Sequence, residues 1–301
     1  MPVRVENDLA VASRGSLSRV SPIMGETGKL EGVVITTKNG IQSVASEEFE
    51  ERRTPYYLAE RYYMFPPKYT EVLKSWVKAG IIQAGREAGE VFALIQELCD
   101  PVTGYHQRRV EQIAHDIAKR LGYKDTALNE VALAGRLHDS GKASTPKDIL
   151  RKPALLTPEE LEDVMYEHPK VGRMIVHALG CSEVVKDAVE QHHKDARGKG
   201  YPKSVTREDL TQEGQIVRVA DEIDRAANFC YYPKPLKGVR AMKIEFVQGV
   251  MERRYFPEVL VAAAGALLVD HRRWKDIQSL QPPLPLLRAA SGLSYYPATN
   301  F

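Results

Sequence analysis

Cysteine is scarce in this chain, which carries only Cys99, Cys181 and Cys230 among its 301 residues. The three are far apart and odd in number, and none belongs to a CxxC pair. A disulfide framework needs paired cysteines. We therefore expect reduced, mostly buried thiols rather than a disulfide-stabilised fold.

A long apolar run and an excess of either charge are also missing. The longest unbroken apolar stretch, residues 259–269, is too short to span a bilayer, and the first eight residues contain no apolar core of the secretory kind. A net charge of +2 does not favour a nucleic-acid polymer as a partner, although a local basic pocket can still hold an anion. We expect a cytoplasmic protein with no membrane span.

The hydrophobic pattern predicts a mainly α fold behind a small N-terminal α+β domain. Residues 32–44 indicate a β-hairpin, because Asn39-Gly40 is a preferred tight-turn dipeptide. A mostly helical pattern then runs from 69 to 98, weakened by glycines. Further helices are expected at about 105–121, 131–138, 158–168, before Gly180, and at 182–193, 216–228 and 257–269. Gly141 is expected to end the second of these and Pro169 to end the third.

Potential metal ligands surround the doublet His138-Asp139. They are His106, His168, His192, His193 and Asp221, and with His138 they include five of the eight histidines of the chain. Most share helix faces with apolar residues, where burying an unpaired imidazole or carboxylate costs several kcal/mol unless it binds a partner. The set exceeds what one tetrahedral ion needs, which suggests two divalent ions such as iron, manganese or zinc. Two ions clamping one water suit the hydrolysis of phosphate esters.

The alternative for each histidine is a hydrogen-bonded core residue, which is the commoner role for a lone buried histidine. Convergence of five histidines with aspartates favours metal binding instead. A second doublet, His115-Asp116, lies half a turn around the helix from His106 and is expected to face solvent.

The order of these motifs resembles the HD-GYP domain family. The segments that carry the resemblance are residues 138–142 (HDSGK), 168–172 (HPKVG), 192–193 (HH), 198–202 (GKGYP) and 219–221 (VAD). The match covers roughly residues 100–270. The resemblance implies an HD-type helical bundle and membership of a superfamily of metal-dependent phosphohydrolases. HD-GYP domains hydrolyse the bacterial second messenger cyclic di-GMP to linear pGpG or to GMP.

The resemblance also implies roles for individual residues. One ion, iron or manganese with zinc as an alternative, is expected on His106, His138, Asp139 and Asp221; the other is expected on Asp139, His168, His192 and His193. Asp139 would then bridge the two. The residues expected to act in catalysis are Lys142, Asp139 and Asp224. Those expected to contact the cyclic dinucleotide are Lys142, Tyr201, Asp224, Arg225 and Lys234. Independently of the resemblance, a carboxylate such as Asp195 or Asp224 could orient a ligating histidine or shuttle a proton.

The chain departs from the family pattern at two places that matter for function. Val102 stands where many members carry a glutamate that helps to hold a third ion, so two ions are expected. Residues 229–234 (FCYYPK) replace an arginine-containing run that contacts the nucleotide. Another nucleotide, such as a hybrid cyclic dinucleotide, therefore stays open as the substrate. So does a signalling module that binds its ligand with little turnover.

We expect three parts in the chain: residues 1–98 as an N-terminal domain, 99–280 as the phosphohydrolase domain, and 281–301 as an extended, proline-containing tail. By analogy with enzymes of this type that are joined to input domains, the first part is expected to regulate or to dimerise, which would make the protein a homodimer.

Overall fold

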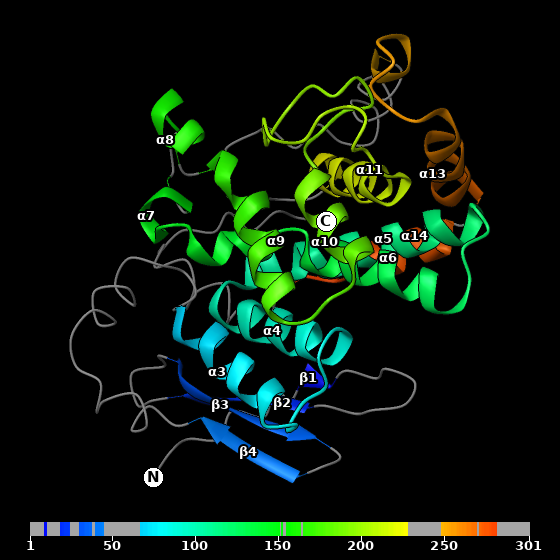
Figure 1. Ribbon diagram of the computed structural model, residues 1–301. Coiled ribbons are helices and arrows are strands. Elements are labelled where there is room, and N and C mark those ends of the chain that lie inside the picture. The colour runs from blue at the N-terminus through cyan, green and yellow to red at the C-terminus, as the bar shows by residue number, and fades with distance from the viewer. Residues whose placement is uncertain are drawn as a thin grey trace, which may run out of the picture.

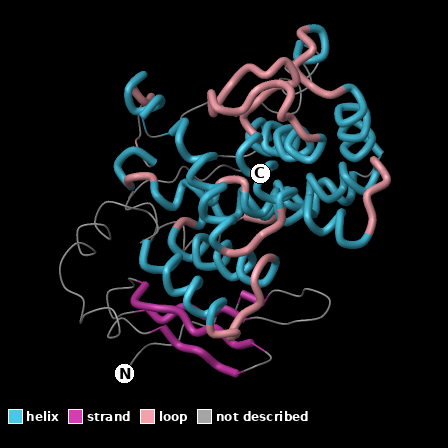
Figure 2. The backbone as a smooth tube through the Cα atoms, in the orientation of Figure 1, coloured by secondary structure: helices cyan, strands magenta, loops and turns pink. Residues whose placement is uncertain are grey.

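The computed structural model describes residues 9–10, 19–24, 30–37, 40–44, 67–150, 152, 155–163, 165–227, 248–269 and 271–281. Helices make up most of this part of the chain, and the strands are confined to its N-terminal end (Figure 2). The predicted mainly α fold is therefore confirmed. Residues 229–234, with Lys234, and the tail beyond 281 lie outside the described residues, so the predictions for them stay predictions.

The N-terminal strands form an antiparallel sheet in the order β1-β2-β3-β4. The strands are β1 (Leu9–Ala10), β2 (Arg19–Met24), β3 (Leu30–Thr37) and β4 (Gly40–Val44). Thr37 pairs with Gly40 at the end of the β3–β4 ladder, which confirms the predicted hairpin. Strands β2 and β1 extend this hairpin into the sheet.

The predicted helical run 69–98 is two helices, α3 (Pro67–Lys78) and α4 (Arg86–Cys99). Gly80 and Gly85 separate them with φ angles of 69° and 84°, which residues with a Cβ rarely adopt. α4 lies between α3 and the helices of the candidate site in the ribbon (Figure 1).

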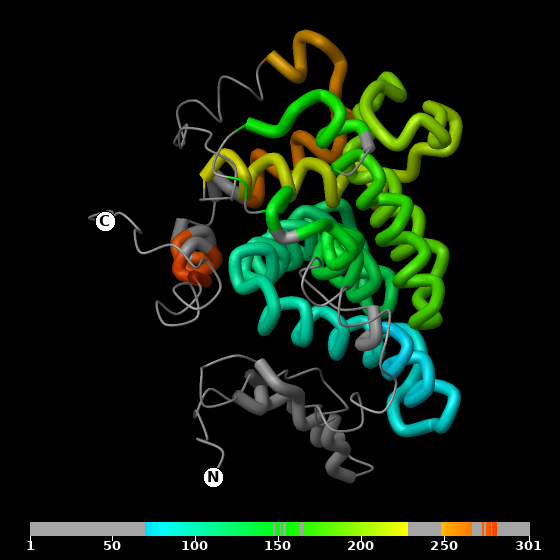
Figure 3. Tube along the Cα trace, turned by 90° about the vertical axis from the view of Figure 1, so that its left-hand side faces the viewer, coloured from blue at the N-terminus to red at the C-terminus, as the bar shows by residue number. Residues whose placement is uncertain are grey.

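The central helices are α5 (Pro101–Arg120) and α6 (Asp125–Leu137), which pack against each other. Asp100 caps α5 by accepting a hydrogen bond from Thr103 N at 3.3 Å, and Pro101 occupies the first turn, where its missing N–H costs nothing. α11 (Gln212–Ala227) and α13 (Pro257–Val269) also contact α5. In the turned view α11, in yellow, lies above α5 and α6, which it contacts (Figure 3).

Between α6 and α11 the chain forms shorter elements. These are η1 (Ser140–Ser144), α7 (Lys147–Leu150), α8 (Pro158–Asp163), η2 (Met165–Glu167), α9 (His168–Ala178) and α10 (Glu183–Gln191), and α14 (His271–Gln278) follows α13. The predicted helix 158–168 is wrong in its extent, because α8 ends at Asp163. Pro169 does not end a helix. It lies in the first turn of α9, a position that suits its fixed φ and missing N–H.

Gly141 also differs from its prediction, since α6 ends at Leu137 and Gly141 lies inside η1. A Cβ at Gly141 would stand 1.8 Å from the carbonyl oxygen of His168 and 2.7 Å from Gly172 N. The glycine is required because η1 and the start of α9 approach each other backbone to backbone.

Two apolar clusters hold the helices together. The first joins α4, α6, α9 and α10 through residues such as Phe92, Leu137 and Val189; the second joins α5, α11 and α13 around Ile117 and Ile223. The boundary predicted between residues 98 and 99 thus falls at the end of a helix that shares the first cluster. Among the described residues, no helix combines the length and the apolar character needed to cross a bilayer.

Candidate metal centre

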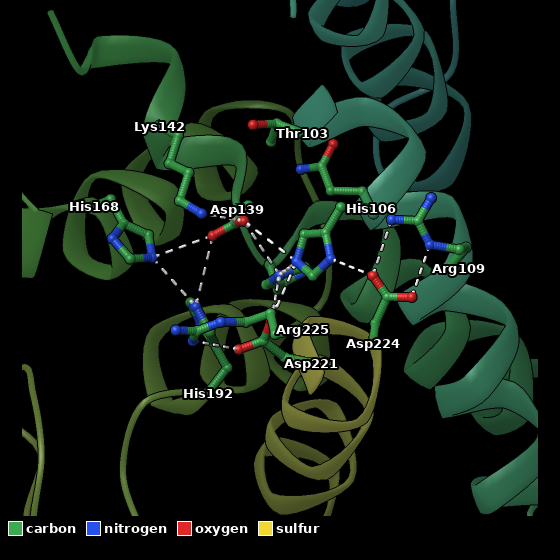
Figure 4. Close-up of polar contacts among 12 residues, drawn as sticks. Thr103, His106, Arg109, Asp139, Lys142, His168, His192, Asp221, Asp224 and Arg225 are labelled. Carbon is green, nitrogen blue, oxygen red and sulfur yellow. Dashed lines mark hydrogen bonds and ion pairs between the residues drawn. The ribbon is translucent and has the colours of Figure 1, made fainter. Parts of the chain in front are cut away.

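All seven predicted metal ligands come together in one buried place (Figure 4 shows His106, Asp139, His168, His192 and Asp221). They come from separate elements: α5, the end of α6, the turn before η1, the start of α9, the end of α10 and α11. Two groups have ligand atoms that lie within 4.8 Å of one another. One is Asp139 with His168, His192 and His193, and the other is His106 with His138 and Asp139.

Asp139 belongs to both groups, and each of its oxygens faces one of them. Oδ2 lies 3.6 Å from His106 Nε2 and 3.4 Å from His138 Nε2. Oδ1 lies 3.3 Å from His168 Nε2 and 3.9 Å from His192 Nε2. Asp221 completes the first group, with Oδ1 placed 3.1 Å from His106 Nε2 and 3.8 Å from His138 Nε2. This is the arrangement of a carboxylate that can bridge two cations.

Three of the histidines are oriented by the same local device. Nδ1 of His138, His168 and His192 lies 2.8, 2.5 and 2.7 Å from the carbonyl oxygen three residues earlier in the chain. A carbonyl oxygen only accepts hydrogen bonds, so Nδ1 carries the hydrogen and donates it, and Nε2 keeps a free lone pair. His138 and His192 directly follow helices, whose last carbonyl groups lack helical partners.

The Nε2 atoms then face each other. His106 Nε2 lies 3.2 Å from His138 Nε2, and His168 Nε2 lies 3.3 Å from His192 Nε2. His168 and His192 both keep a lone pair on Nε2, and two lone pairs at 3.3 Å repel unless a cation lies between or beside them. Imidazole nitrogens and carboxylate oxygens are also the ligands that iron, manganese and zinc accept. The donor set therefore fits metal ions.

The electrostatics of the site prepare most ligands in the form that binds metal. Burial, together with mutual repulsion, holds the pKa of His192 and His193 well below the usual range, and burial lowers that of His168. Burial alone would raise the pKa of Asp139 and Asp221, but Lys142 and His138 around the first and Arg225 and His106 around the second hold both well below normal. These histidines are neutral and these aspartates ionised at neutral pH.

His106 is the exception. Burial lowers its pKa, but hydrogen bonds to Asp221 and Asp224 outweigh burial and raise the value to about 9. A protonated His106 can donate from Nε2 to Asp221 and from Nδ1 to Asp224, at 3.1 and 2.7 Å. A cation bound beside Asp221 would take the place of the His106 Nε2 proton.

Asp224 was expected to act in catalysis and to contact the substrate, or to orient a ligating histidine. It is 1% exposed and lies behind His106, which favours the orienting role. Its Oδ2 accepts from His106 Nδ1, while Arg109 donates to both oxygens, from Nε at 2.7 Å and from a terminal nitrogen at 3.1 Å. Asp224 is therefore placed to orient a ligand, as carboxylates behind metal-bound histidines do, and not to touch substrate.

Apart from Lys234, which lies outside the described residues, the other predicted substrate contacts line the rim of the centre. Lys142 Nζ lies 2.5 Å from Asp139 Oδ2, and Arg225 donates to Asp221 Oδ2 at 3.2 Å. Tyr201 packs beside His193, with ring centroids 4.5 Å apart, and stacks on Tyr166 at 4.2 Å. All are partly exposed, so they combine closeness to the ligands with access from solvent.

The loop before Tyr201 is shaped by its glycines. Gly200 has a φ of 105°, and a Cβ there would stand 2.0 Å from the carbonyl oxygen of His193. Asp195, considered as a carboxylate that might orient a histidine, instead binds Arg197 and the Lys199 N–H in this loop. It therefore stabilises the loop that carries Tyr201.

The second His-Asp doublet lies away from the centre, as predicted. A third of the His115 side chain is exposed, and its Nδ1 pairs with Asp116 at 3.0 Å. Asp116 also accepts from Arg273 at 2.9 Å. The two doublets of the chain thus have different environments despite their identical residues.

The sequence analysis gave no role in the site to three residues that the structure places there. Arg109 had a usable signal, since it is a charge one turn after His106 on an inward face. Gln96 is a polar residue within the apolar stretch of α4, and its side chain donates to the Asp139 carbonyl oxygen at 3.1 Å. Tyr166 gave no signal, because its position depends on the short η2.

Comparison with known proteins agrees with this geometry. A family model described as "HD domain" matches residues 91–245, slightly more than half of the chain. A cyclic di-GMP phosphodiesterase of Thermotoga maritima is 34% identical over 181 residues, which cover 58% of this chain and 48% of that protein. A 3'3'-cGAMP-specific phosphodiesterase of Vibrio cholerae is 28% identical over 185 residues, covering 61% of this chain and 34% of that protein.

The chain thus spans half or less of the length of these relatives. Among solved structures, the HD domain of an L. monocytogenes phosphodiesterase overlaps 58% of this chain and 94% of its own, with 18% identity and a TM-score of 0.44. The family match contains the helices that supply all seven ligands. The chain belongs to the HD domain family.

Proposed function

We propose that the protein is a metal-dependent phosphodiesterase that hydrolyses cyclic di-GMP to linear pGpG, to GMP, or to both. The observation that carries the proposal is that the two carboxylate oxygens of Asp139 face two separate histidine groups. The nearest histidine nitrogens lie 3.3–3.6 Å from these oxygens. Such a carboxylate suits a pair of neighbouring cations, and paired cations are a recurrent solution for phosphodiester hydrolysis.

Two divalent ions, iron or manganese with zinc as an alternative, would occupy the centre. One would be held by His106, His138, Asp139 and Asp221, and the other by Asp139, His168, His192 and His193. When bound, the ions supply Lewis acidity and a water that is deprotonated near neutral pH. Val102 is apolar and 9% exposed, which supports two ions rather than three.

Lys142 and Arg225 are the cationic groups that we assign to the phosphate. Lys142 has 17% of its side chain exposed and Arg225 has 38%, and each already contacts a ligand carboxylate. An ammonium and a guanidinium on the solvent side of the ligands can stabilise the negative charge that grows on the phosphoryl oxygens. Asp224 and Arg109 behind His106 hold that imidazole in place.

Tyr201 and Tyr166 form a stacked pair beside His193, and we assign Tyr201 to the nucleotide. Burial raises the pKa of Tyr201, so its phenol keeps its proton and can donate a hydrogen bond. An aromatic ring with a polar tip suits a ligand that has both bases and phosphates.

A second candidate substrate is a hybrid cyclic dinucleotide. Residues 229–234 lack the arginines that the family pattern carries, and one relative of the chain is named for 3'3'-cGAMP. The metal centre would perform the same hydrolysis on either molecule. Faster turnover of the hybrid would move the assignment to that substrate.

The experiment compares the two His-Asp doublets of the chain. Protein loaded anaerobically with iron or with manganese is incubated with cyclic di-GMP, 3'3'-cGAMP or cyclic di-AMP, and the products are separated by chromatography. Asp139→Asn should abolish turnover, whereas Asp116→Asn, the matched change in the other doublet, should leave it intact. If the protein binds cyclic di-GMP tightly but cleaves none of it with either metal, the proposed activity is wrong and the protein is a binding module.

A further inference from the structure

Helix α4 reaches the candidate metal centre through one side chain. Gln96 Nε2 donates a hydrogen bond to the main-chain oxygen of Asp139 at 3.1 Å, across 43 residues of sequence. Gln96 is 2% exposed and Asp139 is 1% exposed. A residue from outside the predicted phosphohydrolase domain thus contacts the backbone of the bridging carboxylate.

The amide of Gln96 is itself held in place. Its Oε1 accepts a hydrogen bond from Gln107 Nε2 at 3.3 Å, and Gln107 is fully buried on α5, next to His106. The two glutamines form a chain from α5 through α4 to Asp139. Because the Asp139 carbonyl oxygen can only accept, Gln96 must present its NH2 group to it, which leaves Gln96 Oε1 to accept from Gln107.

Asp139 needs such a restraint more than a helical residue would. It lies between α6 and η1 with φ −96° and ψ 15°, in the sparsely populated bridge region where many active-site residues are found. Its carbonyl oxygen accepts from Lys142 N at 3.0 Å inside η1. Gln96 adds a second donor from a different helix, and so fixes this peptide group relative to the rest of the bundle.

The position of α4 does not depend on Gln96. The neighbouring Glu97 is buried and accepts from Arg108 at 2.6 Å and from Arg136 at 2.7 Å, which ties α4 to α5 and α6 by ion pairs. Leu94 and Ile95 are in the apolar cluster that α4 shares with α6, α9 and α10. Removing the Gln96 amide should therefore leave α4 packed in place. It should remove only the hydrogen bond that α4 donates to the Asp139 carbonyl oxygen.

We propose that Gln96 is a positioning residue, which acts through the Asp139 backbone to set the direction of the bridging carboxylate. This inference rests on the proposed dinuclear centre. On its other side, α4 contacts β2 and β3. One helix therefore connects the N-terminal sheet with the residue shared by both metal groups.

The test measures metal binding rather than activity alone. Gln96→Met keeps an unbranched side chain of similar length but cannot donate to a carbonyl. Titration calorimetry of Mn²⁺ into the chelator-treated full chain should show about a tenfold loss of affinity in this variant, as is usual when a partner behind a metal ligand is removed. Turnover should recover at high Mn²⁺, with KM for the nucleotide unchanged.

Leu94→Ala is the matched control on the same helix. It removes buried apolar contacts without touching Asp139, so it should lower the melting temperature and leave Mn²⁺ affinity within twofold of wild type. Gln107→Met, which frees the Gln96 amide indirectly, should weaken Mn²⁺ binding in the same direction as Gln96→Met. It also serves as the test if Gln96→Met does not fold.

The outcomes separate the two proposals. If wild type binds two Mn²⁺ ions and both glutamine variants bind them with unchanged affinity, the role of Gln96 is overturned while the metal centre stands. The role of Gln96 is also overturned if Leu94→Ala loses as much Mn²⁺ affinity as the two glutamine variants. If wild type binds no Mn²⁺ and no Fe²⁺, the proposed function fails, and the role of Gln96 fails with it.

Discussion

The carboxylate of Asp224 lies 2.7 Å from His106 Nδ1, on the side of the imidazole opposite to Asp221. This contact fixes the ring so that Nε2 points toward the candidate metal position. Of the two roles considered for this carboxylate, contact with substrate and orientation of a ligand, the contact favours the second.

Asp224→Asn should therefore reduce metal affinity and not substrate binding. Carboxylates behind metal-bound histidines typically contribute about 10–100-fold to metal affinity. We expect a loss of that size for Mn²⁺ by calorimetry, with KM for the cyclic dinucleotide unchanged once metal is saturating. A raised KM with unchanged Mn²⁺ affinity would show instead that Asp224 contacts the substrate.

Arg109 should contribute to the stability of the fold as well as to the metal centre. It is 2% exposed, pairs with Asp224, and donates to the Leu280 carbonyl oxygen at 2.7 Å. Removing one partner of a buried ion pair costs about 3–5 kcal/mol, because the other charge stays buried. Arg109→Met should lower the free energy of unfolding by that amount in urea denaturation of the metal-free protein.

Arg173→Met provides the comparison for Arg109. Arg173 pairs with Asp187 and Glu183 at the surface and has 32% of its side chain exposed. Exposed pairs contribute about 0–1 kcal/mol. Equal destabilisation by the two variants would show that burial of the Arg109 pair is not decisive.

Gly141 should tolerate no side chain. The Cβ of Gly141→Ala would stand 1.8 Å from the His168 carbonyl oxygen, and backbone atoms cannot move aside as a flexible side chain can. The variant must separate η1 from α9, and with them Asp139 from His168. We expect loss of Mn²⁺ binding by calorimetry, together with a lowered melting temperature.

Gly265→Ala is the control for that substitution. Gly265 lies inside α13, and an added Cβ would meet only the end of the Arg120 side chain, at 3.2 Å. Alanine in a helix interior is favoured over glycine by about 0.5–1 kcal/mol. Metal binding should be unchanged, and a loss equal to that of Gly141→Ala would refute the steric explanation.

Metal binding should release a proton. The pKa of His106 is raised to about 9, so this imidazole is protonated in the metal-free protein at neutral pH, and coordination through Nε2 requires the neutral form. Affinity should therefore rise with pH, by about tenfold per pH unit below 9 if only this group titrates. His168, His192 and His193, whose pKa values are lowered, contribute little to this dependence at neutral pH.

The measurement is Mn²⁺ calorimetry at pH 7 in buffers with different ionisation enthalpies. The apparent enthalpy of wild type should vary with the buffer in proportion to one released proton. His106→Asn should reduce that number. An enthalpy independent of buffer would contradict a protonated His106.

The sequence alone determined the fold class and the set of candidate ligands. Apolar residues recurring with helical period placed His106 and His138 on buried faces, and Asn39-Gly40 indicated the hairpin between β3 and β4. These are local properties, because periodicity and turn preference depend on residues close together in the chain.

The tertiary structure decided what lies behind the ligands and how close the backbones come. The contact of Gln96 with Asp139, the pairing of Arg109 with Asp224, and the approach of Gly141 to His168 each join residues that are 27 to 115 positions apart. No periodicity encodes such pairs, since they depend on how the helices pack. For the same reason Pro169 starts α9 instead of ending a helix: proline marks a boundary, and only the packed chain sets on which side of it the helix lies.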